Sequence, residues 1–165
     1  MYVELGRFLG HVLGSKSLWK DGDLWTAVLL GVGSFWLFAE FPFIQDGISS
    51  HLADVLTITS IIFGFVLSSM IFYVQAAGGW SKDHRVQRVA QKIIDWHVWT
   101  ILCLLGLIVW IVILWATNNQ VTCFPVAKRI GHSFLVFLSL YCGFQILNHA
   151  LTVWWAFTKQ DQLGN

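Results

Sequence analysis

Long apolar runs separated by short polar segments are the main feature of this chain. The hydrocarbon core of a bilayer is about 30 Å thick, so a helix needs about 20 mostly apolar residues to cross it. Four runs meet this requirement, at about residues 24–41, 55–77, 95–116 and 130–157. The pattern therefore predicts an all-α protein, an integral membrane four-helix bundle that forms a single domain over residues 1–165.

Residues 2–19 precede the first run and have an amphipathic pattern. At helical spacing, apolar side chains such as Phe8 and Val12 fall near one face, while Glu4, Arg7 and His11 fall largely on the other. A helix with two such faces lies in the headgroup region of a membrane. We therefore predict an N-terminal interfacial amphipathic helix.

The third helix is predicted to be longer than the membrane is thick. It begins near Lys82 and continues to Ala116, a length of about 50 Å at the helical rise. Two or three of its turns should stand outside the bilayer. One side of these turns carries Arg85, Arg88 and Lys92, which we expect to bind anionic lipid headgroups. A docking site for a cytoplasmic protein or a small anionic ligand is the alternative.

The basic residues also predict the orientation. Three lie before the first run, four between the second and third runs, and one in the C-terminal tail. On the opposite side, the connection 42–54 has none and the connection before the fourth run has two, Lys128 and Arg129. Because Lys and Arg accumulate on the cytoplasmic side, both termini are predicted to be cytoplasmic.

The composition limits the classes of function. Hydrophobic residues make up 56% of the chain and charged residues only 12%, about half the share in soluble domains. A net charge of +1 gives no general attraction to nucleic acid. The sequence has no glycine-rich phosphate loop, no His-Glu-x-x-His motif and no nucleophile with an evident base. We expect a non-enzymatic protein whose main partner is the lipid bilayer.

The second run contains a stripe of small and hydroxylated residues at one-turn spacing, formed by Thr57, Ser60, Gly64 and Ser68. Small residues let helix backbones approach closely, and hydroxyl groups form hydrogen bonds between helices. The first interpretation is helix packing, either within the bundle or between protomers of a homo-oligomer. The second is a mildly polar pore lining in such an oligomer.

The fourth run becomes polar toward its cytoplasmic end. Polar side chains are costly in hydrocarbon unless they have partners, so this face should look into the bundle or into a wet cavity. We expect His97 of the third run to lie at a similar depth. The predicted intramembrane polar cluster comprises His97, Gln145, Asn148, His149 and Thr152.

Several roles are open for this cluster. The simplest is an interfacial histidine that packs against headgroups and Trp96, and a structural polar network is the next. A His97–His149 pair would also suit a proton-sensitive switch or two haem ligands. No cofactor is required by the sequence, and haem is the one considered.

The layout resembles small four-span proteins of bacterial phage-exclusion and anti-phage defence systems. The features that carry the resemblance are the hydroxyl-rich span from Thr57 to Ser69, the basic turn from Lys82 to Lys92, the long third helix, and the polar residues from Gln145 to His149. The resemblance implies a bacterial inner-membrane protein, either a pore-forming effector or a Kiwa-like membrane-sensing subunit that holds a cytoplasmic partner. It supplies no catalytic residue.

Two other functions fit the same chain. One is a haem-binding membrane electron carrier that uses the histidine pair. The other is a passive membrane anchor for a cytoplasmic enzyme, in which the basic stripe matters and the spans tolerate substitution.

Overall fold

The computed structural model describes residues 21–79, 84–117 and 125–163, and side chains within them except at 76–92, 149 and 152–163. The predicted interfacial helix at 2–19 lies outside these residues. In the described part every regular element is a helix. The helices are α3 (Gly22–Glu40), α4 (Pro42–Ser50), α5 (Leu52–Gly79), α6 (His84–Thr117) and α7 (Pro125–Leu163).

Four of these helices are long and apolar enough to cross a membrane, which confirms the predicted number. Their apolar segments are Gly22–Glu40, Leu52–Gln75, Ile93–Thr117 and Pro125–Asn148. Helix α6 begins nine residues before its apolar segment, and α7 continues to Leu163. The expectation that the third helix extends beyond its apolar segment is therefore confirmed.

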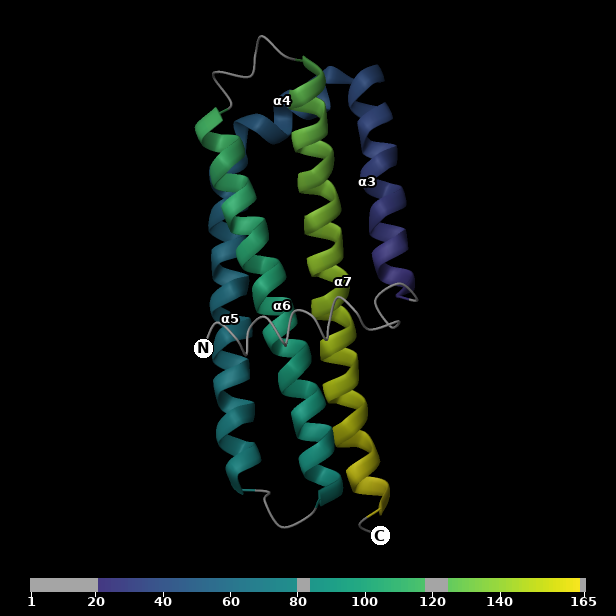
Figure 1. The fold of residues 1–165 in the computed structure, drawn as a ribbon, viewed down its shortest axis with the longest axis vertical. Coiled ribbons are helices and arrows are strands. Elements are labelled where there is room, and N and C mark those ends of the chain that lie inside the picture. Colours follow the sequence, from purple (N-terminus) through teal and green to yellow (C-terminus); the bar gives the residue numbers. More distant parts are fainter. Residues whose placement is uncertain (1–20, 80–83, 118–124, 164–165) are drawn as a thin grey trace, which may run out of the picture.

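The long helices α5, α6 and α7 run side by side, and the shorter α3 lies along one half of this length (Figure 1). Helix α3 packs mainly on α7, and α5 packs mainly on α6. Contacts between α6 and α7 join these two pairs. Two indole groups strengthen this junction, because Trp99 donates to the Tyr141 hydroxyl at 3.1 Å and Trp110 donates to the Gly131 carbonyl at 3.0 Å.

The connection between the first two spans contains a helix that the apolar pattern did not predict. Helix α4 follows α3 after a single residue, Phe41, whose backbone angles (φ −126°, ψ 74°) are not helical. The residue before a proline is disfavoured in the α conformation, and proline suits the first position of a new helix. Pro42 therefore ends α3 and starts α4, which lies across one end of the bundle (Figure 1).

The interior of the bundle is filled by side chains of α5, α6 and α7. Its buried apolar residues include Leu52, Leu104, Leu107, Ile111, Leu135 and Cys142. The outer surface is also apolar: Leu29, Trp36, Phe43 and Phe65 are each 69–72% exposed. A large exposed apolar surface is unfavourable in water but compatible with hydrocarbon. An apolar interior together with an apolar outer surface is therefore consistent with a helix bundle surrounded by lipid.

One glycine allows α3 to approach α7 closely. A Cβ atom at Gly31 would lie 2.8 Å from the Cβ of Phe137 and 3.4 Å from the backbone of α7. Glycine is therefore required for the present distance between these helices. Gly33, two residues later, has no atom within 4 Å of such a Cβ and faces open space.

Candidate functional site

His97 of α6 is a buried polar residue that faces α5. Its side chain is 1% exposed. The Nδ1–H donates to the carbonyl of Ile93 at 2.9 Å, which leaves Nε2 of the neutral ring as an acceptor. Ser69 Oγ of α5 lies 3.4 Å from Nε2, at the long end of hydrogen-bond distances. The Tyr73 ring completes the group, with its centroid 5.2 Å from that of His97.

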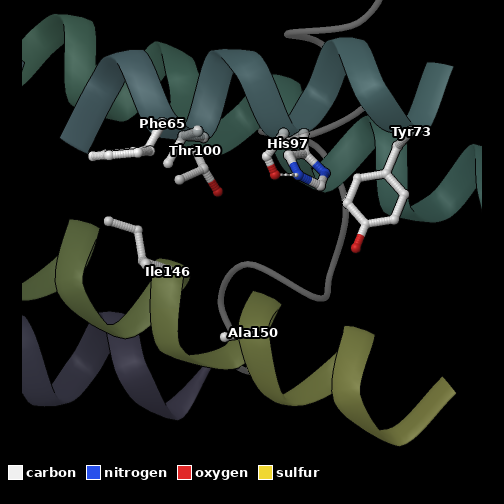
Figure 2. Close-up of a pocket in the computed structure, with 8 residues that line it drawn as sticks. Phe65, Tyr73, His97, Thr100, Ile146 and Ala150 are labelled. Atoms are coloured by element: carbon white, nitrogen blue, oxygen red, sulfur yellow. Dashed lines mark hydrogen bonds between the residues drawn. The ribbon is translucent and has the colours of Figure 1, made fainter. Parts of the chain in front are cut away.

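A cavity of about 250 Å³ adjoins this group. Figure 2 shows Tyr73, His97 and Thr100 on the α5 and α6 side, with Ile146 and Ala150 of α7 opposite them. Phe65 lines one end and is 72% exposed, so the cavity reaches the outer surface of the bundle. It therefore combines one hydrogen-bonding wall with an otherwise apolar lining.

The predicted partners Gln145 and Asn148 bind a different helix. Gln145 is 5% exposed, and its Nε2 donates to Asp21 Oδ2 at 3.4 Å. Asn148 donates to Asp23 Oδ2. Asp21 is also the N-cap of α3, where its side chain accepts from the Asp23 backbone N–H at 3.1 Å. These four side chains join the start of α3 to the middle of α7.

The described contacts of the predicted cluster fall on two helices. His97 has partners on α5, whereas Gln145 and Asn148 have partners on α3. The side chains of His149 and Thr152 lie outside the described residues. On the face of α7 that was predicted to be polar, Gln145 is buried, and Cys142, one turn earlier, is 2% exposed.

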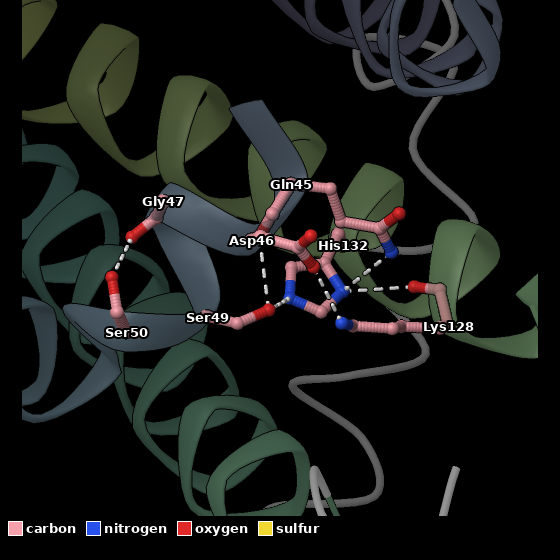
Figure 3. Close-up of polar contacts among 7 residues, drawn as sticks. All are labelled: Gln45, Asp46, Gly47, Ser49, Ser50, Lys128 and His132. Carbon is pink, nitrogen blue, oxygen red and sulfur yellow. Dashed lines mark hydrogen bonds and ion pairs between the residues drawn. The ribbon is translucent and has the colours of Figure 1, made fainter. Parts of the chain in front are cut away.

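A second polar group lies at the α4 end of the bundle (Figure 3). His132 of α7 is 2% exposed. Its Nδ1–H donates to the Lys128 carbonyl at 2.8 Å, and Ser49 Oγ of α4 lies 2.8 Å from Nε2. Gln45 Nε2 lies 3.4 Å from Nδ1. The ring is therefore held by α4 on one side and by its own helix on the other.

An ion pair between α4 and α7 lies beside His132 at this end of the bundle. Lys128 Nζ lies 2.9 Å from Asp46 Oδ1, with the lysine side chain 20% exposed and the aspartate 68% exposed. Sequence analysis missed this group because it treated residues 42–54 only as a connection between two spans. The available signal was an acidic residue, Asp46, on the same predicted side as Lys128.

The small-residue stripe of α5 lies on the outer surface of the chain. Thr57, Ser60, Gly64 and Ser68 are all exposed. The three hydroxyl groups donate to carbonyls four residues earlier, at 2.8–2.9 Å. A Cβ at Gly64 would have no atom within 4 Å. In the single chain, therefore, this stripe contributes nothing to packing within the bundle.

The predicted basic stripe falls on the first turns of α6. The backbone of Arg85, Arg88 and Lys92 is helical. Their side chains lie outside the described residues, so the choice between a lipid and a protein partner stays a prediction.

The described histidines have different environments. His51 binds Asp54 at 2.9 Å and its side chain is 70% exposed. Both ring nitrogens of His132 have close neighbours, whereas Nε2 of His97 has the long contact to Ser69. No group of three or more His, Cys, Asp or Glu side chains within the described residues is placed to hold a metal ion. A haem held by His97 and His149 stays a prediction.

In the described residues, four helices are long and apolar enough to cross a membrane, and buried polar groups lie at two levels of the bundle. Comparison of the chain with protein-family models, curated proteins and solved structures finds no match.

Proposed function

We propose that this protein is a homo-oligomeric four-span protein of a bacterial inner membrane, and that its protomers contact one another through the outer face of α5. The observation that carries the proposal is the exposure of all four stripe residues, Thr57, Ser60, Gly64 and Ser68. Small residues on a lipid-facing surface favour association between helices, because they permit close backbone contact.

The activity that we propose for this assembly is that of a pore-forming effector or a membrane-sensing subunit. The interior of one chain is filled by residues such as Leu104 and Ile111, so a water-filled path would form between protomers. The stripe hydroxyls could line such a path, since each oxygen retains the capacity to accept a further hydrogen bond. A sensing subunit would instead use the basic first turns of α6 to hold a cytoplasmic partner.

A role in anti-phage defence is part of this proposal and is supported by the resemblance in layout. The cytoplasmic location of both termini is supported by the distribution of Lys and Arg. The defence role and the location of the termini require tests in cells. Self-association through α5 can be tested first, on the purified protein.

The test is the mass of the purified protein in mild detergent, measured by light scattering. We expect a discrete oligomer for the natural chain and a monomer for the double variant Ser60→Leu, Gly64→Leu. The matched control is Gly106→Leu, because Gly106 is also exposed and has open space around it, but on α6. An unchanged mass in the double variant, or an equal loss in the control, would contradict the proposed interface.

A second measurement separates the two activities. A pore-forming effector should release ions from liposomes, and the double variant should abolish that release. A sensing subunit should form the oligomer without conductance. A visible absorption spectrum recorded on the same sample tests the alternative of a haem carrier, which would show a Soret band lost in His97→Ala or His149→Ala.

A further inference from the structure

The cavity beside His97 has the chemical character of a ligand site. We propose that it binds the ring of a lipid-soluble phenol, of the class of isoprenoid quinols, and that it prefers the quinol to the quinone. This inference concerns the inner face of α5 and is independent of the proposed function, which concerns its outer face.

The orientation of Ser69 is the first support. Helix α5 carries four other serine and threonine residues, and each donates to the carbonyl four residues earlier in its own helix: Thr57, Thr59, Ser60 and Ser68. Ser69 instead faces His97 on α6, at 3.4 Å. A ligand hydroxyl placed beside both groups would accept from Ser69 and donate to His97 Nε2, in place of one long hydrogen bond.

The protonation of His97 explains the preference for a quinol. Its Nδ1–H donates to the Ile93 carbonyl at 2.9 Å, so Nε2 of the neutral ring can only accept. Thr100 donates its own hydroxyl proton to the Trp96 carbonyl at 3.0 Å and offers a second acceptor to the cavity. A quinol hydroxyl donates to such groups. A quinone carbonyl can only accept, and it would compete with His97 Nε2 for the single Ser69 proton.

The size and lining of the cavity support a single ring. Its volume is about 250 Å³, and an apolar cavity of about 150 Å³ accommodates benzene. The Tyr73 ring, tilted by 50° to that of His97, supplies an aromatic wall. The apolar tail would leave past Phe65, whose exposed ring marks the end of the cavity at the outer surface.

The depth of the cavity fits a molecule held in the membrane. Ser69 lies six residues before Gln75, where the apolar segment of α5 ends, and His97 lies four residues after Ile93, where that of α6 begins. The polar ring would therefore lie near the membrane surface, with its tail in hydrocarbon.

The experiment is calorimetric titration of the full chain, in nanodiscs of defined phospholipid, with decylubiquinol under nitrogen and with decylubiquinone. We expect the quinol to bind at least about tenfold more tightly, since an analogue without the hydroxyl cannot donate to His97 Nε2. Ser69→Ala should weaken quinol binding about five- to tenfold, the effect of one lost hydrogen bond. The matched control Ser68→Ala should leave binding unchanged.

A second variant closes the cavity without removing a polar group. Ala150 is exposed and lines the α7 side, so Ala150→Phe should abolish quinol binding while the protein elutes from size exclusion like the natural chain. Absence of quinol binding by the natural chain, equal binding of quinol and quinone, or binding unaffected by both Ser69→Ala and Ala150→Phe would each overturn the proposal. None of these outcomes depends on the oligomeric mass, which tests the proposed function separately.

Discussion

His132 of α7 and Ser49 of α4 lie 2.8 Å apart, measured from ring Nε2 to hydroxyl oxygen, although 83 positions separate them in the sequence. The proton on Nδ1 is directed to the Lys128 carbonyl. The Ser49 hydroxyl also lies 2.9 Å from the Gln45 carbonyl, so its single proton is shared between that oxygen and Nε2 of His132. The contact attaches α4 to the end of the fourth span and closes one end of the bundle.

The first prediction concerns this contact. Ser49→Ala should lower the free energy of unfolding by about 1 kcal/mol, because it leaves the buried Nε2 of His132 without its hydroxyl partner. Thermal unfolding in detergent, followed by circular dichroism, measures the change. The control is Ser50→Ala, since the Ser50 hydroxyl is exposed and donates to Gly47 of the same helix at 2.8 Å. Equal effects of the two substitutions would show that the contact does not stabilise the fold.

The second prediction concerns the distance between α3 and α7. Gly31→Ala should destabilise the protein by about 1–3 kcal/mol, the usual effect of an added methyl group in a packed contact. The new Cβ would lie 2.8 Å from Phe137 Cβ. Gly33→Ala, which meets open space, should be neutral or stabilising by up to about 1 kcal/mol through helix propensity. Thermal unfolding of both variants measures the two changes in stability. A destabilised Gly33→Ala together with an unaffected Gly31→Ala would contradict the close packing of α3 on α7 at Gly31.

The third prediction concerns the pair of Lys128 and Asp46. A double-mutant cycle with Lys128→Met and Asp46→Asn should give a coupling energy of about 0.2–1 kcal/mol, as expected for a partly exposed ion pair. The coupling should decrease at high salt, because the aspartate is 68% exposed and is screened by ions. A coupling energy of zero at low salt would mean that the pair has no energetic role.

The fourth prediction concerns the start of α3. Gln145→Leu combined with Asn148→Leu should lower the free energy of unfolding by about 1–2 kcal/mol, in the range of single polar contacts between membrane helices. The reason is that Asp21 and Asp23 lose their amide donors. Leu147→Ala on the exposed side of the same turn is the control. A double variant as stable as that control would indicate that the amide contacts contribute nothing.

The fifth prediction concerns orientation. A reporter that is active only in the cytoplasm should be active when fused after Asn165, and inactive when inserted between α6 and α7. The reason is the excess of Lys and Arg in the N-terminal segment and around the start of α6, from Lys82 to Lys92. The opposite pattern of activity would reverse the assignment of the two faces.

The spans were predictable because they depend on local composition. A run of about 20 apolar residues is sufficient to identify a helix that can cross a bilayer, and all four runs lie in helices. Helical periodicity within the fourth run also predicted that Gln145 faces inward. Helix α4 was missed, because its nine residues are too few for a span and the Pro42 that begins it was interpreted as part of a connection.

The partners of the polar residues were not predictable in the same way. Periodicity states which face of a helix is polar, but which neighbour meets that face depends on how the helices pack. His97 and Gln145 were predicted to share one cluster, yet Ser69 lies beside the first and Asp21 beside the second. The reason is that α5 packs on α6, while α3 packs on α7 and begins at the level of Gln145.

The sequence by itself determined that four helices are long and apolar enough to cross a membrane and that the third extends beyond its apolar segment, because both depend on how many apolar residues follow one another. The tertiary structure alone decided that the Thr57–Ser68 stripe faces outward, that His97 lines a cavity, and that Ser49 reaches His132. These are relations between helices, and they are set by packing distances such as that between Gly31 and Phe137.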